Sequence, residues 1–141
     1  MISADEVPDV EADEVLARFV FSRRHIRNNG TIKPEAFIPP PPDNELSVTR
    51  HRDATEEELW GIGRAIATVR GRTLHGRGDI TSRAFLDHEL SMQAAPVTNH
   101  ASLPDNPNHA IVIGWPDDKP RQKLIALDIA RQARLSRPTD P

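Results

Sequence analysis

The chain has 141 residues, the usual size of one domain with a modest hydrophobic core. Hydrophobic residues make up 37% and charged residues 28%, as in an ordinary globular protein, while aromatic residues make up only 4%. The chain contains no cysteine, which excludes a disulfide scaffold, an iron–sulfur cluster, a cysteine zinc finger and a thiol nucleophile.

The formal net charge of −3 hides an uneven distribution. Residues 1–14 carry six of the 21 acidic residues and no Lys or Arg, so residues 15–141 hold all 18 basic residues against 15 acidic ones, a net charge of +3. A charge run with little apolar content is typical of disorder. We therefore expect an acidic disordered tail over residues 1–14, a single domain over residues 15–136 and a C-terminal tail over residues 137–141.

The sequence also bears on location and on bound groups. The first residues are acidic where a signal peptide needs basic residues followed by an apolar run, and no apolar stretch is long enough to span a membrane. We expect a cytoplasmic protein with no membrane partner. The six histidines lack the spacing of a helical zinc site, so we predict neither a metal nor a cofactor, although convergence of His51, His109 and Asp105 in the fold remains open.

Two short strands are predicted in the first part of the chain. In residues 16–22, apolar side chains recur at every second position from Ala17 to Phe21, the pattern of a half-buried strand. Residues 46–50 are rich in β-branched side chains and form the second candidate. Between them, the four consecutive prolines of residues 39–42 predict an extended polyproline stretch.

The clearest local signal predicts a helix over residues 56–70. Thr55 and Glu58 have the spacing of a capping box, and three consecutive glutamates place negative charge at the positive end of the helix dipole. Apolar residues follow at helical spacing, and Gly71 lies where a C-terminal cap belongs.

The second half of the chain predicts two more strands and a second long helix. Residues 72–89 are left unassigned, because Gly76 and Gly78 loosen the chain and residues 81–86 suit either a strand or a helical turn. Residues 90–95 alternate like a strand, and residues 110–115 form the best candidate for a central strand. A final helix is expected from an aspartate cap at residues 117–118 to Pro138. This order predicts an α+β fold, a small mixed or antiparallel sheet covered by two helices on one face.

Basic residues are clustered after the first two predicted strands. Four arginines lie between Arg18 and Arg27 without an intervening acid, and a second cluster covers residues 50–52. If the two strands pair, the clusters can meet at one end of the sheet and bind a phosphate or carboxylate, because guanidinium groups match such anions. Two alternatives are a solvated basic edge that discourages strand pairing and an acidic tail that folds over the basic surface and screens it.

A polar loop over residues 104–109 leads directly into the strand predicted to be central. Loops beside sheet ends often carry binding residues, but Asn and Asp also stabilise turns through bonds to their own backbone. With the basic clusters, this loop supplies the candidate residues for binding an anion or a partner. They are Arg23, Arg24, Arg27, Arg50, His51, Arg52, Asn108 and His109.

These features favour a small binding module that recognises a protein or an anionic, phosphate-bearing partner, with nucleic acid among the candidates. The alternative is a small enzyme acting on a nucleotide or nucleic-acid phosphate, which requires His51 or His109 as acid–base group to share a cleft with Arg24, Arg50 or Arg52. The sequence assigns no catalytic residue and leaves open whether the protein is an enzyme. For the binding module, we expect removal of residues 1–14 to leave the fold intact and to strengthen anion binding.

Three segments resemble a family of small, uncharacterised bacterial proteins. They are residues 46–51 (LSVTRH), residues 106–110 (NPNHA) and residues 114–116 (GWP), followed by a helix rich in Lys, Leu and Ala. The resemblance covers roughly residues 15–136. It implies a bacterial, cytosolic, single-domain protein and carries no activity, cofactor or site residue with it.

Overall fold

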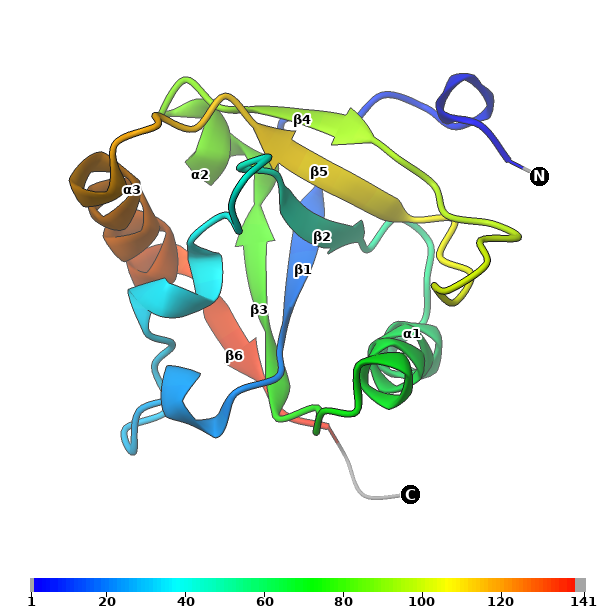
Figure 1. The fold of residues 1–141 in the computed structure, drawn as a ribbon, viewed down its shortest axis with the longest axis horizontal. Coiled ribbons are helices and arrows are strands. Elements are labelled where there is room, and N and C mark those ends of the chain that lie inside the picture. Colours follow the sequence, from blue (N-terminus) through cyan, green and yellow to red (C-terminus); the bar gives the residue numbers. More distant parts are fainter. Residues whose placement is uncertain (1, 139–141) are drawn as a thin grey trace.

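The fold belongs to the α+β class with an antiparallel sheet, as expected. A computed structural model describes residues 2–138 (Figure 1). None of the helices within these residues has the length and apolar character needed to cross a membrane. The strands are β1 (Val15–Val20), β2 (Leu46–Arg50), β3 (Gly76–Thr81), β4 (Ser91–Ala94), β5 (His109–Ile113) and β6 (Arg134–Ser136). The helices are α1 (Glu56–Arg70), α2 (Ser82–Leu86) and α3 (Lys119–Gln132), with 3-10 turns η1 (Ala4–Glu6), η2 (Arg23–His25) and η3 (Pro34–Phe37).

The strands form one sheet in the order β4-β5-β2-β1-β3-β6, and every neighbouring pair is antiparallel. β1 pairs with β3 along its whole length, from Val15 opposite Thr81 to Val20 opposite Gly76. Its pairing with β2 is limited to two positions, after which β2 turns away from β1 (Figure 1). The expectation that residues 110–115 form the central strand is wrong: they contribute β5, and the centre of the sheet is β2 and β1.

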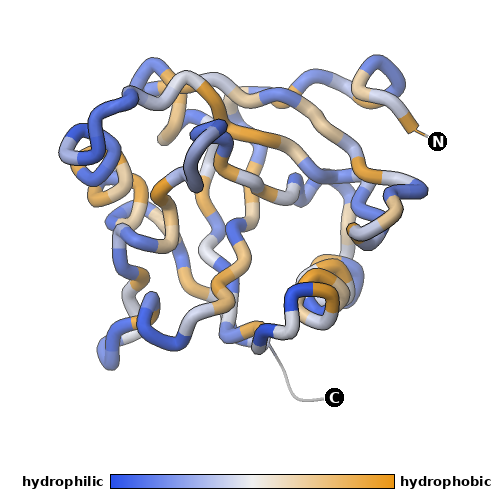
Figure 2. Tube along the Cα trace, viewed as in Figure 1, coloured by the Kyte–Doolittle hydropathy of each residue, from blue (hydrophilic) through white to orange (hydrophobic). Residues whose placement is uncertain are grey.

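The two faces of the sheet are covered by different helices. Leu16 and Ile80 belong to the main hydrophobic core together with residues of α2, α3 and η3. Phe19 points to the opposite face, where it lies against Gly63 of α1. The helices that share a face are therefore α2 and α3, and α1 is not one of them. β1 is buried on both sides, so the sheet needs a cover on each face. Figure 2 shows the hydrophobic residues along the strands and on the inner sides of the helices.

Local signals located α1 and β2 correctly, but not the end of the last helix. α1 begins with the capping box between Thr55 and Glu58 and ends at Gly71, whose φ of 61° suits glycine. Helix α3 ends at Gln132 instead of continuing to Pro138, and the chain then forms β6 along the edge of β3. Residues 139–141 of the expected C-terminal tail lie outside the described residues.

Two further segments differ from expectation. The undecided stretch of residues 72–89 contains both a strand and a helix, β3 followed directly by α2. The polyproline stretch of residues 39–42 is not extended throughout, because residues 41–44 form a turn.

The end of the expected disordered tail is docked on the domain. The backbone N–H groups of Ser82 and Arg83 donate to the carbonyls of Glu14 and Ala12, each at 2.9 Å. Val10 packs against the main core. The segment leading into β1 therefore contacts the folded domain through its backbone and through Val10.

The packing of α1 on β1 makes a testable distinction between two glycines of the same helix. A Cβ at Gly63 would lie 2.8 Å from the Phe19 ring, whereas a Cβ at Gly61 meets nothing within 4 Å. We expect Gly63→Ala to lower the free energy of unfolding by about 1–3 kcal/mol through overpacking. Gly61→Ala should raise it by up to about 1 kcal/mol through helix propensity. Urea unfolding measures both, and equal effects would contradict this packing of α1.

Candidate anion-binding site

The two basic clusters lie at opposite ends of the sheet. β1 and β2 are antiparallel, so the residues that follow β1 and those that end β2 are separated by the length of the strands. Arg23, Arg24 and Arg27 lie in and after η2 at one end, and residues 50–52 lie at the other. The expectation that they gather at one sheet end is therefore wrong, because it required parallel pairing of the two strands.

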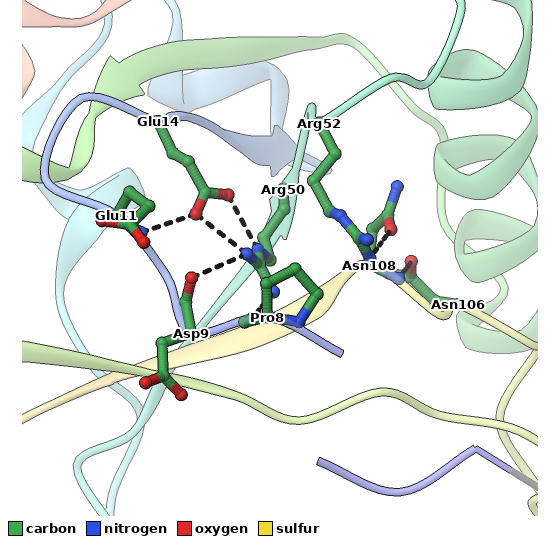
Figure 3. Close-up of polar contacts among 8 residues, drawn as sticks. All are labelled: Pro8, Asp9, Glu11, Glu14, Arg50, Arg52, Asn106 and Asn108. Atoms are coloured by element: carbon green, nitrogen blue, oxygen red, sulfur yellow. Dashed lines mark hydrogen bonds and ion pairs between the residues drawn. The ribbon is translucent and has the colours of Figure 1, made fainter. Parts of the chain in front are cut away.

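Arg50 is held inside the domain by the N-terminal segment (Figure 3). Its side chain is 2% exposed, and its Nε and Nη2 each donate to the Glu14 carboxylate at 2.8 Å. Nη1 donates to the Pro8 carbonyl at 2.7 Å and Nη2 to the Asp9 carbonyl at 3.1 Å. This bidentate pair with added carbonyl acceptors occupies the guanidinium from within the chain. The interpretation that the acidic segment screens the basic surface holds at Arg50.

The other residues at this end are also engaged within the protein. Arg52 Nη1 donates to Asn108 Oδ1 at 3.3 Å, and the Asn108 N–H donates to Asn106 Oδ1 at 3.1 Å (Figure 3). Asn106 is 3% exposed and its Nδ2 donates to Thr49 Oγ1 at 3.0 Å. The asparagines of the 104–109 loop therefore stabilise the loop and fix it to β2.

The two candidate acid–base histidines lie on the same face of the sheet but line different cavities. His51 Nε2 is 2.8 Å from Asp79 Oδ1, and the pair lines a cavity of about 440 Å³ at the end of β3. His109 Nδ1 is 2.8 Å from the carbonyl of Ala95, and its ring borders a narrow cavity of about 30 Å³ between the sheet and α1. The shared cleft that the enzyme hypothesis requires is not formed. Within the described chain, no three His, Asp or Glu side chains are placed to hold a metal ion.

A network around the buried Arg77 side chain connects the His51 end of the sheet to α1. Arg77 is 1% exposed. Its Nε donates a hydrogen bond to Asp79 at 2.9 Å, and its Nη2 donates one to Glu56 at 2.8 Å. Its guanidinium also stacks on the Trp60 ring, 4.6 Å from the ring centroid. Burial by itself raises the pKa of Asp79, but hydrogen bonds from His51 and Arg77 outweigh it and lower the pKa. The network fixes the start of α1 to β3.

A cationic cavity of about 430 Å³ lies at the opposite end of the sheet, between the end of β1, η2 and the end of α1. Its lining residues are Arg18, Phe19, Phe21, Ser22, His25, Ala36, Arg70 and Arg72. As far as residues 2–138 define it, this lining includes no Asp or Glu. The three guanidinium groups also form no ion pair with any described carboxylate.

Arg18 reaches this cavity because β1 and β2 separate. The ladder between them stops after Ala17, and the Arg18 side chain enters the space where it would continue. Its Nε donates to the Ala36 carbonyl at 2.9 Å and its Nη1 to the Ser47 carbonyl at 3.0 Å. Burial and the nearby charge of Arg70 lower the pKa of Arg18 to about 10, so it remains charged at neutral pH.

The other two arginines are placed by the end of α1. Arg70 is the last helical residue, and its guanidinium lies 5.4 Å from the centroid of the Phe21 ring. Gly71 turns the chain in the left-handed region, and the Arg72 N–H bonds back to the Ala67 carbonyl at 2.9 Å, as in a Schellman cap. The C-terminal cap of α1 therefore places two cations in the lining of the cavity.

His25 is the one histidine in the described lining of the cavity. Burial lowers the pKa of His25, the charge of Glu35 raises it, and the charges of Arg18 and Lys33 lower it further. The net direction is downward, so the imidazole is mainly neutral at pH 7. An anion bound in the cavity would favour protonation of His25 and add a fourth cation.

Sequence reasoning included Arg18 in a cluster but did not select it, and it missed Arg70 and Arg72 entirely. The available signal was the Arg-Gly-Arg triplet at the C-terminal cap of the helix predicted over residues 56–70. Its proximity to β1 depends on the tertiary packing of α1. Of the selected residues, Arg23 and Arg24 lie on η2 beside the cavity, but they do not line it.

Comparisons of the chain with protein-family models, with curated proteins and with solved structures found no match. The functional argument therefore depends on the geometry and charge of the site.

The contact between Glu14 and Arg50 predicts a stability effect that reverses the expectation for the N-terminal segment. We expect Glu14→Ala to cost about 3 kcal/mol of unfolding free energy, because it leaves a buried guanidinium without its carboxylate. Asp13→Ala removes the same charge from an exposed neighbour and should change stability by less than about 0.5 kcal/mol. Chemical unfolding at pH 7 measures the difference, and equal losses would contradict the contact.

The same pair predicts a pH dependence. Burial raises the pKa of Glu14, but hydrogen bonds from Arg50 and the Glu11 backbone lower it below the ordinary value of 4.5. A lowered carboxyl pKa stabilises the fold above 4.5, and this contribution is lost as the pH falls through the folded-state pKa. The stability difference between wild type and Glu14→Ala should shrink on acidification in that window.

The electrostatics of the cavity predict opposite effects of two surface substitutions on His25. Lys33→Met removes a positive charge and should raise the pKa of His25, whereas Glu35→Gln removes a negative charge and should lower it. NMR titration of the imidazole measures both shifts. Shifts of the same sign would contradict the arrangement of charges around His25.

Proposed function

We propose that this protein is a binding module for a phosphate-bearing anion, and that the cationic cavity is its binding site. One observation carries the proposal: Arg18, Arg70 and Arg72 line a single cavity without an acidic partner in the described lining. Elsewhere in the fold, Arg50 and Arg77 are each paired with a carboxylate.

The chemistry of the cavity supports a phosphate more than a single carboxylate. A carboxylate is matched by one guanidinium fork, whereas a phosphate monoester carries a charge of about −1.5 to −2 and three acceptor oxygens at neutral pH. Three guanidinium groups and the His25 ring can share these oxygens. Arg18 and Arg70 also raise each other's electrostatic energy, as the lowered pKa of Arg18 indicates, and a bound dianion relieves that repulsion.

A binding measurement with matched arginine variants tests the proposal. Inorganic phosphate or pyrophosphate should shift the backbone NMR signals of residues 18–25 and 70–72 of the full chain, and added salt should weaken the effect. Arg72→Met should weaken binding roughly tenfold, the equivalent of one charge-assisted hydrogen bond of about 1.5 kcal/mol.

Arg131→Met is the control, because Arg131 is exposed on α3 and its loss changes the net charge equally. It should leave binding within about twofold of wild type, because Arg131 does not line the cavity and salt screens exposed charges. Equal weakening by the two variants, or shifts confined to other parts of the fold, would overturn the assignment of the site.

A further inference from the structure

Resting on the proposed anion site, we propose that the ligand is a nucleoside phosphate, whose phosphate is bound by Arg18, Arg70 and Arg72 and whose base stacks on Phe21. The cavity, its aromatic lining and the basic surface beside it carry this inference.

The cavity is much larger than a phosphate group requires. Its volume of about 430 Å³ lies in the range of about 300–1,000 Å³ that is typical of sites for organic ligands. Beside the arginines it is lined by Phe19, Phe21 and Ala36, so an apolar or aromatic body can lie next to the charged group. A ligand with an anionic end and a flat ring fits this division.

Phe21 differs from every other aromatic residue of the chain. The remaining five aromatic side chains are 0–7% exposed and belong to the interior: Phe19, Phe37, Trp60, Phe85 and Trp115. Phe21 lies one residue beyond β1 and is only half-buried, at the wall of the cavity. A partly exposed ring in a chain so poor in aromatic residues is available for contact with a ligand.

The surroundings of Phe21 hold the ring in a defined orientation. Arg70 lies over it at 5.4 Å from the centroid, and Phe19 supports it with centroids 6.3 Å apart at an interplanar angle of 44°. Aromatic rings and guanidinium planes are the surfaces on which proteins stack nucleic-acid bases. Arg70 is therefore placed to contact both the base and the phosphate of the ligand, because its guanidinium lies against the Phe21 ring and lines the same cavity as Arg18 and Arg72.

The basic surface extends beyond the cavity through η2. Ser22 and His25 line the cavity, and Arg23 and Arg24 between them are exposed. A free mononucleotide and the terminal nucleotide of a single strand share the same phosphate and base. A strand also carries further phosphates, which Arg23 and Arg24 are placed to meet.

Calorimetric titration of the full chain with four probes separates the contributions. The probes are inorganic phosphate, ribose 5-phosphate, adenosine 5′-monophosphate and adenosine. We expect the nucleotide to bind about tenfold more tightly than the sugar phosphate, the size of one base–aromatic stack. Phe21→Leu should abolish this preference, so that the nucleotide and ribose 5-phosphate bind equally, whereas Arg72→Met should weaken the binding of all three phosphate-bearing probes.

The outcomes distinguish this inference from the proposed function. Equal binding of the sugar phosphate and the nucleotide overturns the nucleoside assignment and leaves anion binding intact, while failure of every phosphate overturns both. Should Phe21→Leu not fold, ring-proton NMR of the wild type replaces it. Saturating nucleotide should shift the Phe21 ring signals, ribose 5-phosphate should not, and the absence of that difference counts against stacking.

A further experiment tests whether the ligand is a free nucleotide or the terminal nucleotide of a single strand. A 5′-phosphorylated single-stranded hexanucleotide is compared with the mononucleotide, in wild type and in Arg23→Met/Arg24→Met. If the hexanucleotide binds wild type more tightly than the mononucleotide does, and the double variant loses this difference, the result supports the end of a single strand as the ligand. Equal binding of both ligands in both proteins supports the free nucleotide, and loss of mononucleotide binding in the double variant contradicts the placement of the site.

Discussion

The side chain of Arg18 occupies the space between the two central strands. β1 and β2 pair at only two positions, and beyond them the Ser47 carbonyl accepts a hydrogen bond from Arg18. A buried carbonyl without a donor costs free energy, so the guanidinium satisfies a group that the interrupted ladder leaves behind. The same interruption lets α1 and η3 approach the end of β1 from the two faces of the sheet. The guanidinium of Arg18 thereby lies beside residues of η2, η3 and α1 in the lining of the cavity.

The distribution of carboxylates distinguishes structural arginines from candidate binding arginines. Arg50 is paired with Glu14, and Arg77 is held by Glu56 and Asp79. These pairs attach the N-terminal segment and α1 to the sheet, and removing either partner would leave a buried charge uncompensated. The arginines of the cavity have no such described partner, which leaves their charge for a ligand. Local charge compensation is therefore more informative here than the number of basic residues in a sequence cluster.

Elements with a clear local sequence pattern were predicted well, whereas β6 and the packing of α1 were not. The capping box and Gly71 place both ends of α1, because these contacts are made within a few residues of the chain. β6 is a strand of only three residues that forms by pairing with β3, so the sequence has no periodic pattern from which it could be predicted. The face covered by α1 also escaped prediction, since it depends on the contact between Gly63 and Phe19. Of the residues selected from the sequence, Arg23 and Arg24 lie beside the cavity without lining it, and Arg70 and Arg72 were not selected.

The sequence by itself determined the α+β class, the bounds of α1 and β2, and the separation of an acidic start from a mildly basic remainder. These follow from propensities, caps and composition, which act over short distances along the chain. Only the tertiary structure decided which sheet end each basic cluster occupies, and which arginines are neutralised. The antiparallel direction of β1 and β2 places the clusters far apart, and the docking of Glu14 removes Arg50 from the candidates. Charge compensation arises here from contacts between segments that lie far apart in the chain, and such contacts cannot be predicted from local sequence patterns.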